Sequence, residues 1–239
     1  MYRVKMPTTE QPTRRERLRT MTTTEITTIA LRQMAADGPG AISLRGIARE
    51  MGMTARAIYS YFADRDDLIT ALIGDLSTAL ADALETARDA VPADDPGARL
   101  LAWCTALREW ALTNPEGFRL IYGDPVPGYS APDGAPVELA AQRICSGLNE
   151  LVAALRAPEP GVPVDDSAWP NFPPDYLTKI RADTLTPETA ELALRVWGRV
   201  HGQVSLEIHG HLRPVYADPA ALFHADLLEL VASLGATHR

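Results

Sequence analysis

The chain has 239 residues, 46% of them apolar and 23% charged, which is the balance of an ordinary globular protein with enough apolar material for its own core. Its uninterrupted apolar runs are only a few residues long, which excludes a membrane-spanning helix. Residues 1–19 are polar and lack the apolar middle of a secretion signal, so we expect a cytoplasmic protein. The net charge of −8, taken without its distribution along the chain, argues against nucleic acid as a partner.

The first predicted helix follows a polar arm. Residues 1–13 contain two prolines and little apolar material, and they predict a mobile N-terminal arm. From Arg14 to Asp37 the apolar positions recur at helical spacing, and the Gly-Pro-Gly run at 38–40 ends the helix. Residues 1–70 contain 11 Lys and Arg against 8 Asp and Glu, a net charge of +3. A local basic surface is sufficient to bind the phosphates of a nucleic acid, even on an acidic protein.

A pair of short helices comes next. Ser43 stands where an N-cap belongs, ahead of a short amphipathic helix to Met51, and Thr54 caps a second helix over 55–62. Between them lies Gly52. A tight turn of this kind commonly needs a left-handed backbone, which glycine adopts without a Cβ penalty. The pattern favours a helix-turn-helix over a generic three-helix junction, which has the same spacing.

Helical periodicity continues through the rest of the chain. Two stretches rich in Pro and Gly interrupt it, at 123–136 and 158–174, and we expect both to be loops. No segment shows β alternation or a hairpin signal. The prediction is an all-α protein of about nine helices, with an arm (1–13), a helix-turn-helix domain (14–63) and a larger helical domain (64–239). The six further helices are predicted at 64–89, 96–113, 115–121, 137–156, 187–212 and 219–235.

The helix-turn-helix block carries a specific resemblance. The segments at 43–48, 52–54, 58–62 and 65–68 read SLRGIA, GMT, IYSYF and RDDL. Together they resemble the DNA-binding domain of the TetR/AcrR family of bacterial transcriptional regulators, over residues 14 to about 72. The resemblance implies that the second short helix enters the major groove of DNA. Many members carry Lys-Gly where this chain has Ala55-Arg56, so the operator sequence stays open.

Roles for individual residues follow from their chemistry. Arg56 is the strongest candidate for base readout, because its planar guanidinium matches O6 and N7 of guanine. Ser43 and Arg45 lie at the start of the preceding helix and are expected to contact phosphate. The alternative to base readout is that Arg56 is only a solvated surface charge. The alternative to a DNA contact is that Tyr59 only packs within the protein. The full predicted DNA-binding set is Ser43, Arg45, Thr54, Ala55, Arg56, Tyr59, Ser60, Tyr61 and Arg65.

A single helix-turn-helix contacts few base pairs, so we expect a homodimer on double-stranded DNA. Two glycines on one face of the helix from Pro187 suggest close helix approach, since each glycine costs a helix interior about 1 kcal/mol relative to alanine. An apolar face of the last helix would complete a four-helix bundle. The predicted dimer interface comprises Gly198, Gly202, Ser205, Leu227, Leu230 and Leu234.

The C-terminal part is similar, more weakly, to the TetR-family domain named for its Trp-His-Gly signature, here the non-contiguous Trp197, His201 and Gly202, together with the segment 119–129. That resemblance implies a repressor released by a small molecule. Aromatic walls without buried Arg or Lys predict an uncharged or weakly polar effector, although aromatic stripes are more often plain core. The predicted pocket residues are Trp103, Leu107, Trp110, Phe118, Tyr122, Trp197 and His201.

Other classes of function have weaker support. Glu207 and the nearby histidines invite a metal-responsive regulator, but their spacing matches no known metal motif, and we expect no metal and no cofactor. The chain lacks nucleophile-elbow, phosphate-loop and dinucleotide motifs, so we expect no enzyme. An interaction module that no longer binds DNA, and an activator, stay open. Cys104 and Cys145 are expected to be small buried side chains and not a disulfide.

Overall fold

The computed structural model describes residues 13–132, 136–156, 169, 171–180 and 185–235. In these residues the regular elements are ten α-helices and one short 3-10 helix, with no strand, so the all-α prediction is confirmed and one helix is added to the expected nine. Apart from Thr13, the predicted arm lies outside the described residues. No helix in the described ranges is long and apolar enough to cross a bilayer.

The chain divides into two compact units, and the division falls inside one helix, between Leu72 and Ile73. Unit 1 comprises residues 1–72 and 125–130, and unit 2 comprises 73–124 and 131–239. The segment 125–130 therefore belongs to unit 1 although unit 2 sequence flanks it on both sides. The expected domain limit at residue 63 stays a prediction.

Unit 1 is built from local signals that the sequence shows clearly. Thr13 and Glu16 form a reciprocal capping box at the start of the first helix, and Gly38 closes that helix by donating its N–H to the Met34 carbonyl at 2.8 Å. Ile26, Ile47 and Ile58 are fully buried, and they come from three different helices. The elements of unit 1 are α1 (Arg14–Asp37), η1 (Pro39–Ala41), α2 (Leu44–Glu50), α3 (Ala55–Ile58) and the start of α4 (Arg65–Asp89).

The second short helix is shorter than predicted. It was expected over 55–62, but α3 ends at Ile58 and residues 59–61 form a turn. The cause is a change of hydrogen-bond pattern: the N–H of Ser60 reaches Ala57 at 3.1 Å and that of Tyr61 reaches Ile58 at 2.9 Å. These bonds span three residues and not four, which tightens the chain out of α geometry.

A second chain segment is tied to unit 1 through Tyr129. Its hydroxyl lies 3.0 Å from the Thr70 hydroxyl on α4, and Val126 of the same segment is buried. Three residues before this segment, α6 ends at Tyr122 in unit 2. The two units are therefore joined covalently by α4 and also by the chain that enters and leaves 125–130.

Replacing Tyr129 by phenylalanine should loosen this attachment, because it removes one hydrogen bond with a net contribution of about 0.5–1.5 kcal/mol. We expect amide hydrogen exchange in 125–130 and around Thr70 to become about 2- to 10-fold faster, corresponding to that free energy. Tyr216→Phe, at a half-exposed tyrosine of unit 2, is the control. Equal exchange rates in the wild type and Tyr129→Phe would mean that the bond contributes nothing.

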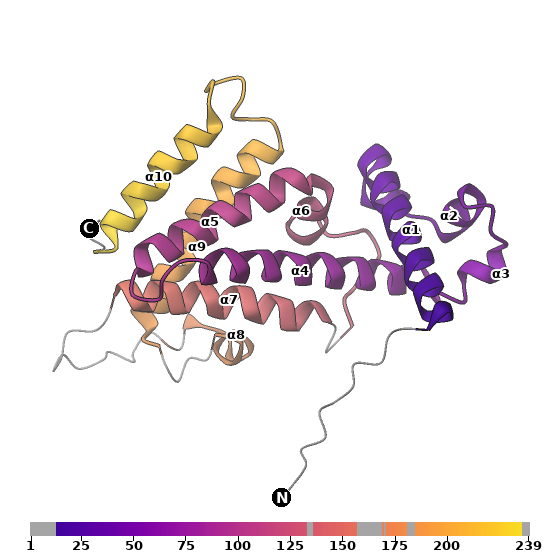
Figure 1. Ribbon diagram of the computed structural model, residues 1–239, viewed down its shortest axis with the longest axis horizontal. Helices are drawn as coiled ribbons and strands as arrows, with labels where there is room; N and C mark the ends of the chain where they lie inside the picture. Colours follow the sequence, from indigo (N-terminus) through magenta and orange to yellow (C-terminus); the bar gives the residue numbers. More distant parts are fainter. Residues whose placement is uncertain (1–12, 133–135, 157–168, 170, 181–184, 236–239) are drawn as a thin grey trace, which may run out of the picture. The chain divides into compact units, whose positions relative to one another are not determined.

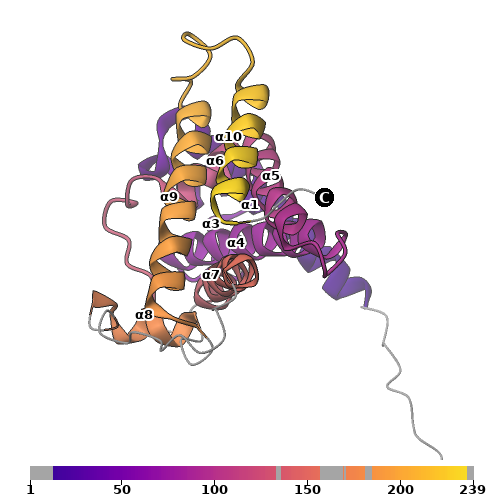
Figure 2. The same ribbon diagram turned by 90° about the vertical axis from the view of Figure 1, so that its left-hand side faces the viewer.

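Unit 2 is a helical bundle centred on α5. This helix contacts α6, α7, α9 and α10, and its residues Trp103, Cys104 and Leu107 are buried in the main core. α9 and α10 run side by side (Figures 1 and 2). The helices that unit 2 adds to the rest of α4 are α5 (Pro96–Thr113), α6 (Pro115–Tyr122), α7 (Pro136–Leu155), α8 (Pro174–Lys179), α9 (Pro187–Ile208) and α10 (Pro219–Ser233).

Two elements of unit 2 differ from expectation. α8 lies at the edge of the stretch predicted as a loop, and it contacts α7. Phe172, Ile180 and Ala190 are buried beside it in a small second core, and Tyr176 packs on that core. α9 ends at Ile208 and not near Leu212, because the chain turns at Gly210 with φ +76°.

Candidate nucleic-acid interface and ligand pocket

The turn between α2 and α3 has the geometry expected of a helix-turn-helix. Gly52 has φ +67°, and the following N–H, of Met53, donates to the Ala48 carbonyl at 2.8 Å. A Cβ added to Gly52 would meet no atom within 4 Å, so only the backbone conformation requires glycine here.

Substitutions at Gly52 should therefore follow backbone preference and not size. We expect Gly52→Ala to destabilise the protein by about 1–2 kcal/mol, Gly52→Val by at least as much, and Gly52→Asn by less, since asparagine tolerates the left-handed region. Thermal unfolding of each variant measures the effect. Gly40→Ala is the control, because Gly40 also has open space around it but no positive φ. A Gly52→Ala variant as stable as Gly40→Ala would contradict the interpretation.

The N-termini of both short helices are capped and exposed. The hydroxyl of Ser43 accepts the N–H of Gly46 at 3.2 Å, and that of Thr54 accepts the N–H of Ala57 at 3.2 Å, which confirms both predicted caps. The exposed residues at these two helix starts are Ser43, Arg45, Thr54, Ala55 and Arg56. Each hydroxyl keeps its own proton free to donate to a phosphate oxygen.

The turn after α3 has its own contacts. Tyr59 is 43% exposed, whereas Tyr61 is half-buried with the Arg19 guanidinium 5.0 Å from its ring centroid. Arg19 also donates to the Ser60 carbonyl at 3.2 Å, and the Ser60 hydroxyl donates to the Ala57 carbonyl at 2.7 Å. Of the three predicted contacts in this turn, Tyr59 and Ser60 are exposed and Tyr61 is half-buried.

Arg65 has a structural role that the resemblance did not indicate. Its Nε donates to the Ile42 carbonyl at 3.1 Å, and one guanidinium nitrogen lies 3.7 Å from Asp66. The side chain is only 29% exposed. These contacts connect the start of α4 to the segment before α2, and the assignment of Arg65 to the DNA-binding set stays a prediction.

Sequence reasoning missed a basic surface at the start of α1. A shallow depression of about 600 Å³ is lined there by Arg14, Arg15, Leu18, Arg19, Ser60 and Tyr61. The first two arginines are exposed. The signal was present in the sequence as the run RRERLR immediately after the Thr13 cap, and it lies beside the turn that follows α3.

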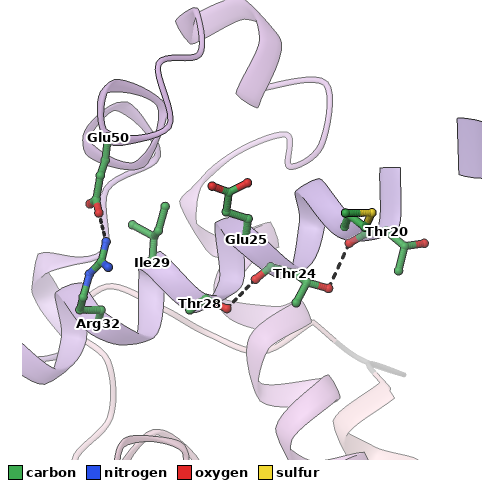
Figure 3. Close-up of a pocket in the computed structure, with 8 residues that line it drawn as sticks. Thr20, Thr24, Glu25, Thr28, Ile29, Arg32 and Glu50 are labelled. Atoms are coloured by element: carbon green, nitrogen blue, oxygen red, sulfur yellow. Dashed lines mark hydrogen bonds and ion pairs between the residues drawn. The ribbon is translucent and has the colours of Figure 1, made fainter. Parts of the chain in front are cut away.

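A second open groove of about 560 Å³ runs along another face of α1 (Figure 3). The hydroxyls of Thr24 and Thr28 point back to their own helix and donate to the carbonyls of Thr20 and Thr24 at 3.0 and 2.7 Å. At one end, Arg32 of α1 pairs with Glu50 of α2. The Arg32–Glu50 ion pair therefore connects α1 to α2 at this end of the groove.

The pocket of unit 2 differs from the predicted one. It has a volume of about 280 Å³ and lies between α6, α7, α8 and α9. Of the seven predicted residues, only Tyr122 and Trp197 line it. The side chains that sequence reasoning missed come from α7, α8 and the outer face of α9. Among the described residues, the lining is Tyr122, Ala141, Ile144, Cys145, Leu148, Asn149, Tyr176, Ala193, Leu194 and Trp197.

The other predicted pocket residues belong to the core behind it. Trp103, Leu107 and Phe118 are buried, and Trp110 packs against the main core and lies close to Gly117. Neighbouring helices cover these four side chains, and their assignment to an effector site stays a prediction.

His201 sits between these core aromatics and the pocket wall. Its ring centroid lies 5.3 Å from that of Phe118 and 5.0 Å from those of both Tyr122 and Trp197. Burial lowers the pKa of the imidazole, and its Nε2 is buried without a partner among the described residues. His201 therefore supports the two aromatic side chains that line the pocket but does not line it.

The predicted dimer residues separate into two groups. Gly198 is exposed, Gly202 and Ser205 are half-buried, and a Cβ added to either glycine would meet nothing within 4 Å. By contrast, the three leucines of the last helix, Leu227, Leu230 and Leu234, are each at most 6% exposed and belong to the core of their own subunit. The apolar face of α10 is thus buried within unit 2, and a dimer contact through these three leucines stays a prediction.

The described residues hold no group of three or more His, Cys, Asp and Glu side chains that could bind a metal ion. The rings of His209 and His211 lie 6.4 Å apart, and Glu207 is paired with Arg108 at 2.7 Å. Glu207 is therefore engaged in an ion pair within the protein. Cys104 is buried, as expected, and burial raises the pKa of its thiol, whereas Cys145 was also expected to be buried and is half-buried.

Comparison with known proteins gives the same two-part division. Residues 26–72 match the family of bacterial regulatory proteins named tetR, and residues 100–230 match the family described as the tetracyclin repressor-like C-terminal domain. The chain is 33% identical over 214 residues to the HTH-type transcriptional regulators Mb1846 of Mycobacterium bovis and Rv1816 of Mycobacterium tuberculosis, covering 88% of this chain and 91% of each relative. The crystal structure of the regulatory protein SCO4313 matches with a TM-score of 0.73 at 36% identity, covering 92% of this chain and all of that one.

Proposed function

The chain belongs to the TetR family of bacterial transcriptional regulators, and from that premise we propose that it is a cytoplasmic repressor, without catalytic activity, which binds a palindromic operator as a homodimer. A small apolar or weakly polar effector entering unit 2 releases the operator. The observation that carries the DNA-binding part is the exposed, capped N-terminus of α3, with Arg56 in its first turn, behind the left-handed Gly52.

The DNA contacts divide by chemistry. Residues at the N-terminus of a recognition helix come nearest to base edges, which assigns readout to Arg56 and a thymine methyl or phosphate contact to Thr54 and Ala55. Ser43 and Arg45 contact phosphate at the N-terminus of α2, and Tyr59 contacts the duplex from the turn after α3. Tyr61 and Ser60 act mainly by holding that turn to Arg19.

The dimer face is assigned to α9. Gly198 and Gly202 lie four residues apart, and the same spacing places Leu194 before them and Leu206 after them. These two leucines are 45% and 46% exposed. The four residues therefore form an apolar stripe along α9, with two glycines that have no side chain at its centre. Such a stripe supports close approach of a second α9 across a two-fold axis, with Ser205 at its edge.

The C-terminal domain is proposed to be of the Trp-His-Gly type, with Trp197 and Tyr122 in the pocket wall and His201 behind them. The effect of a bound effector on DNA binding is proposed to pass through the covalent links between the two units. Tyr122 ends α6 just before the segment 125–130, and α4 continues from one unit into the other. By linkage, effector and operator must weaken each other equally, with a coupling free energy of about 1–3 kcal/mol.

Selection of bound duplexes from random DNA tests the proposal. We expect a palindrome whose half-sites are about one or more helical turns apart, because a two-fold dimer presents α3 twice. Sequence-blind binding, or a monomer at working concentration, would contradict it. The affinity for the selected duplex should fall steeply as the salt concentration rises. A module that no longer binds DNA would select no duplex at all.

A further inference from the structure

Asn149 lines the unit 2 pocket and carries a buried amide oxygen that has no partner among the described residues. The residue is only 2% exposed, and its Nδ2 donates to the Cys145 carbonyl one turn earlier at 2.9 Å. Because a carbonyl can only accept, this bond defines which side-chain atom is nitrogen and which is oxygen. The remaining atom, Oδ1, has no hydrogen-bond partner among the described residues.

A buried amide oxygen without a donor raises the free energy of the folded protein, because its hydrogen bonds to water are lost and no other hydrogen bond replaces them. In the described part of the chain, Ser77, His201 and Gln203 also have such atoms, but none of the three lines the pocket. Of these side chains, Asn149 is the one to which a molecule bound in the pocket could donate the missing hydrogen bond.

The remaining lining restricts what that molecule can be. Among the described residues, this lining contains no Lys, Arg, Asp or Glu side chain, so an ionised ligand would lose its hydration without a counter-charge from them. Burial raises the pKa of the phenols of Tyr122 and Tyr176, so both are neutral at physiological pH. The volume of about 280 Å³ lies at the lower end of the range for small-molecule sites.

We propose that the effector is a compact, neutral and largely apolar molecule with an N–H or O–H group that donates to Oδ1 of Asn149, while Trp197 and Tyr122 contact its apolar part. This inference rests on the proposed function for the existence of an effector, and it adds the effector's chemical class and the residue that selects it.

Matched pairs of probes test this selection. Phenol and toluene, indole and benzofuran, and 2-naphthol and 2-methylnaphthalene have similar shapes within each pair, and only the first member donates a hydrogen bond. We expect the donor member to bind the full-length wild type about 5- to 100-fold more tightly in calorimetric or NMR titration, because the other member leaves Oδ1 unpaired. In Asn149→Leu the preference should disappear.

Gln142→Leu is the matched control, since it makes the same chemical change on α7 at a residue that does not line the pocket. Circular dichroism verifies folding, and Asn149→Met replaces Asn149→Leu if leucine disturbs the packing. Equal binding within every pair, a preference that survives in Asn149→Leu, or no binding of any probe overturns the proposal. Duplex selection on the same preparation is scored separately, so specific DNA binding can stand when the effector class falls.

Discussion

Replacing Arg108 by alanine is expected to lower the free energy of unfolding by about 3–5 kcal/mol. In the wild type, Nε and Nη2 of Arg108 donate to the two carboxylate oxygens of Glu207, both at 2.7 Å. The two side chains are 14% and 6% exposed, and the guanidinium also lies 5.6 Å from the ring centroid of Phe223. The alanine variant would leave the Glu207 carboxylate buried without its partner, and that stranded charge is the main cause of the loss.

Chemical denaturation of matched variants measures this effect. Arg195→Ala removes an arginine from an exposed pair with Glu191 and should change stability by less than about 0.5 kcal/mol. The double variant Arg108→Met with Glu207→Leu should recover most of the loss, because it removes both charges and refills the space. A single Arg108→Ala variant as stable as Arg195→Ala would show that the carboxylate is not confined as described.

Replacing Arg56 by alanine is expected to weaken operator binding by about 1–3 kcal/mol and to relax the preference at one base pair in each half-site. Arg56 is exposed in the first turn of α3, and no hydrogen bond or ion pair within the described residues holds its guanidinium. Its loss should leave the fold unchanged and remove one bidentate contact with guanine. Binding to the selected operator and to its single-base variants measures both effects.

Arg45→Ala supplies the contrast for Arg56. A phosphate contact carries no base information, so its loss should weaken binding to all these duplexes about equally and reduce the slope of affinity against salt by about one unit. If Arg56→Ala shows this uniform pattern, or an unchanged specificity profile, Arg56 does not read a base.

The features that the sequence alone determined are those held by contacts a few residues apart. Ser43 and Thr54 cap their helices within three residues, and Gly52 adopts its left-handed conformation with no neighbour to impose it. Caps, turns and the period of apolar residues are local, so the all-α fold and the helix-turn-helix were predictable. The end of α3 was not predictable, because no residue type marks the change to hydrogen bonds that span three residues after Ile58.

Only the tertiary structure decided which apolar residues face a core and which face a pocket or solvent. Trp103 and Trp197 lie on similar helical stripes, yet the first is covered by neighbouring helices and the second borders a cavity that α8 helps to close. Leu227 is likewise covered within its own subunit while Leu206 stays open. Periodicity tells which side of a helix is apolar, but what covers that side depends on helices distant in the chain, and so do the isolation of Asn149 and the pairing of Arg108 with Glu207.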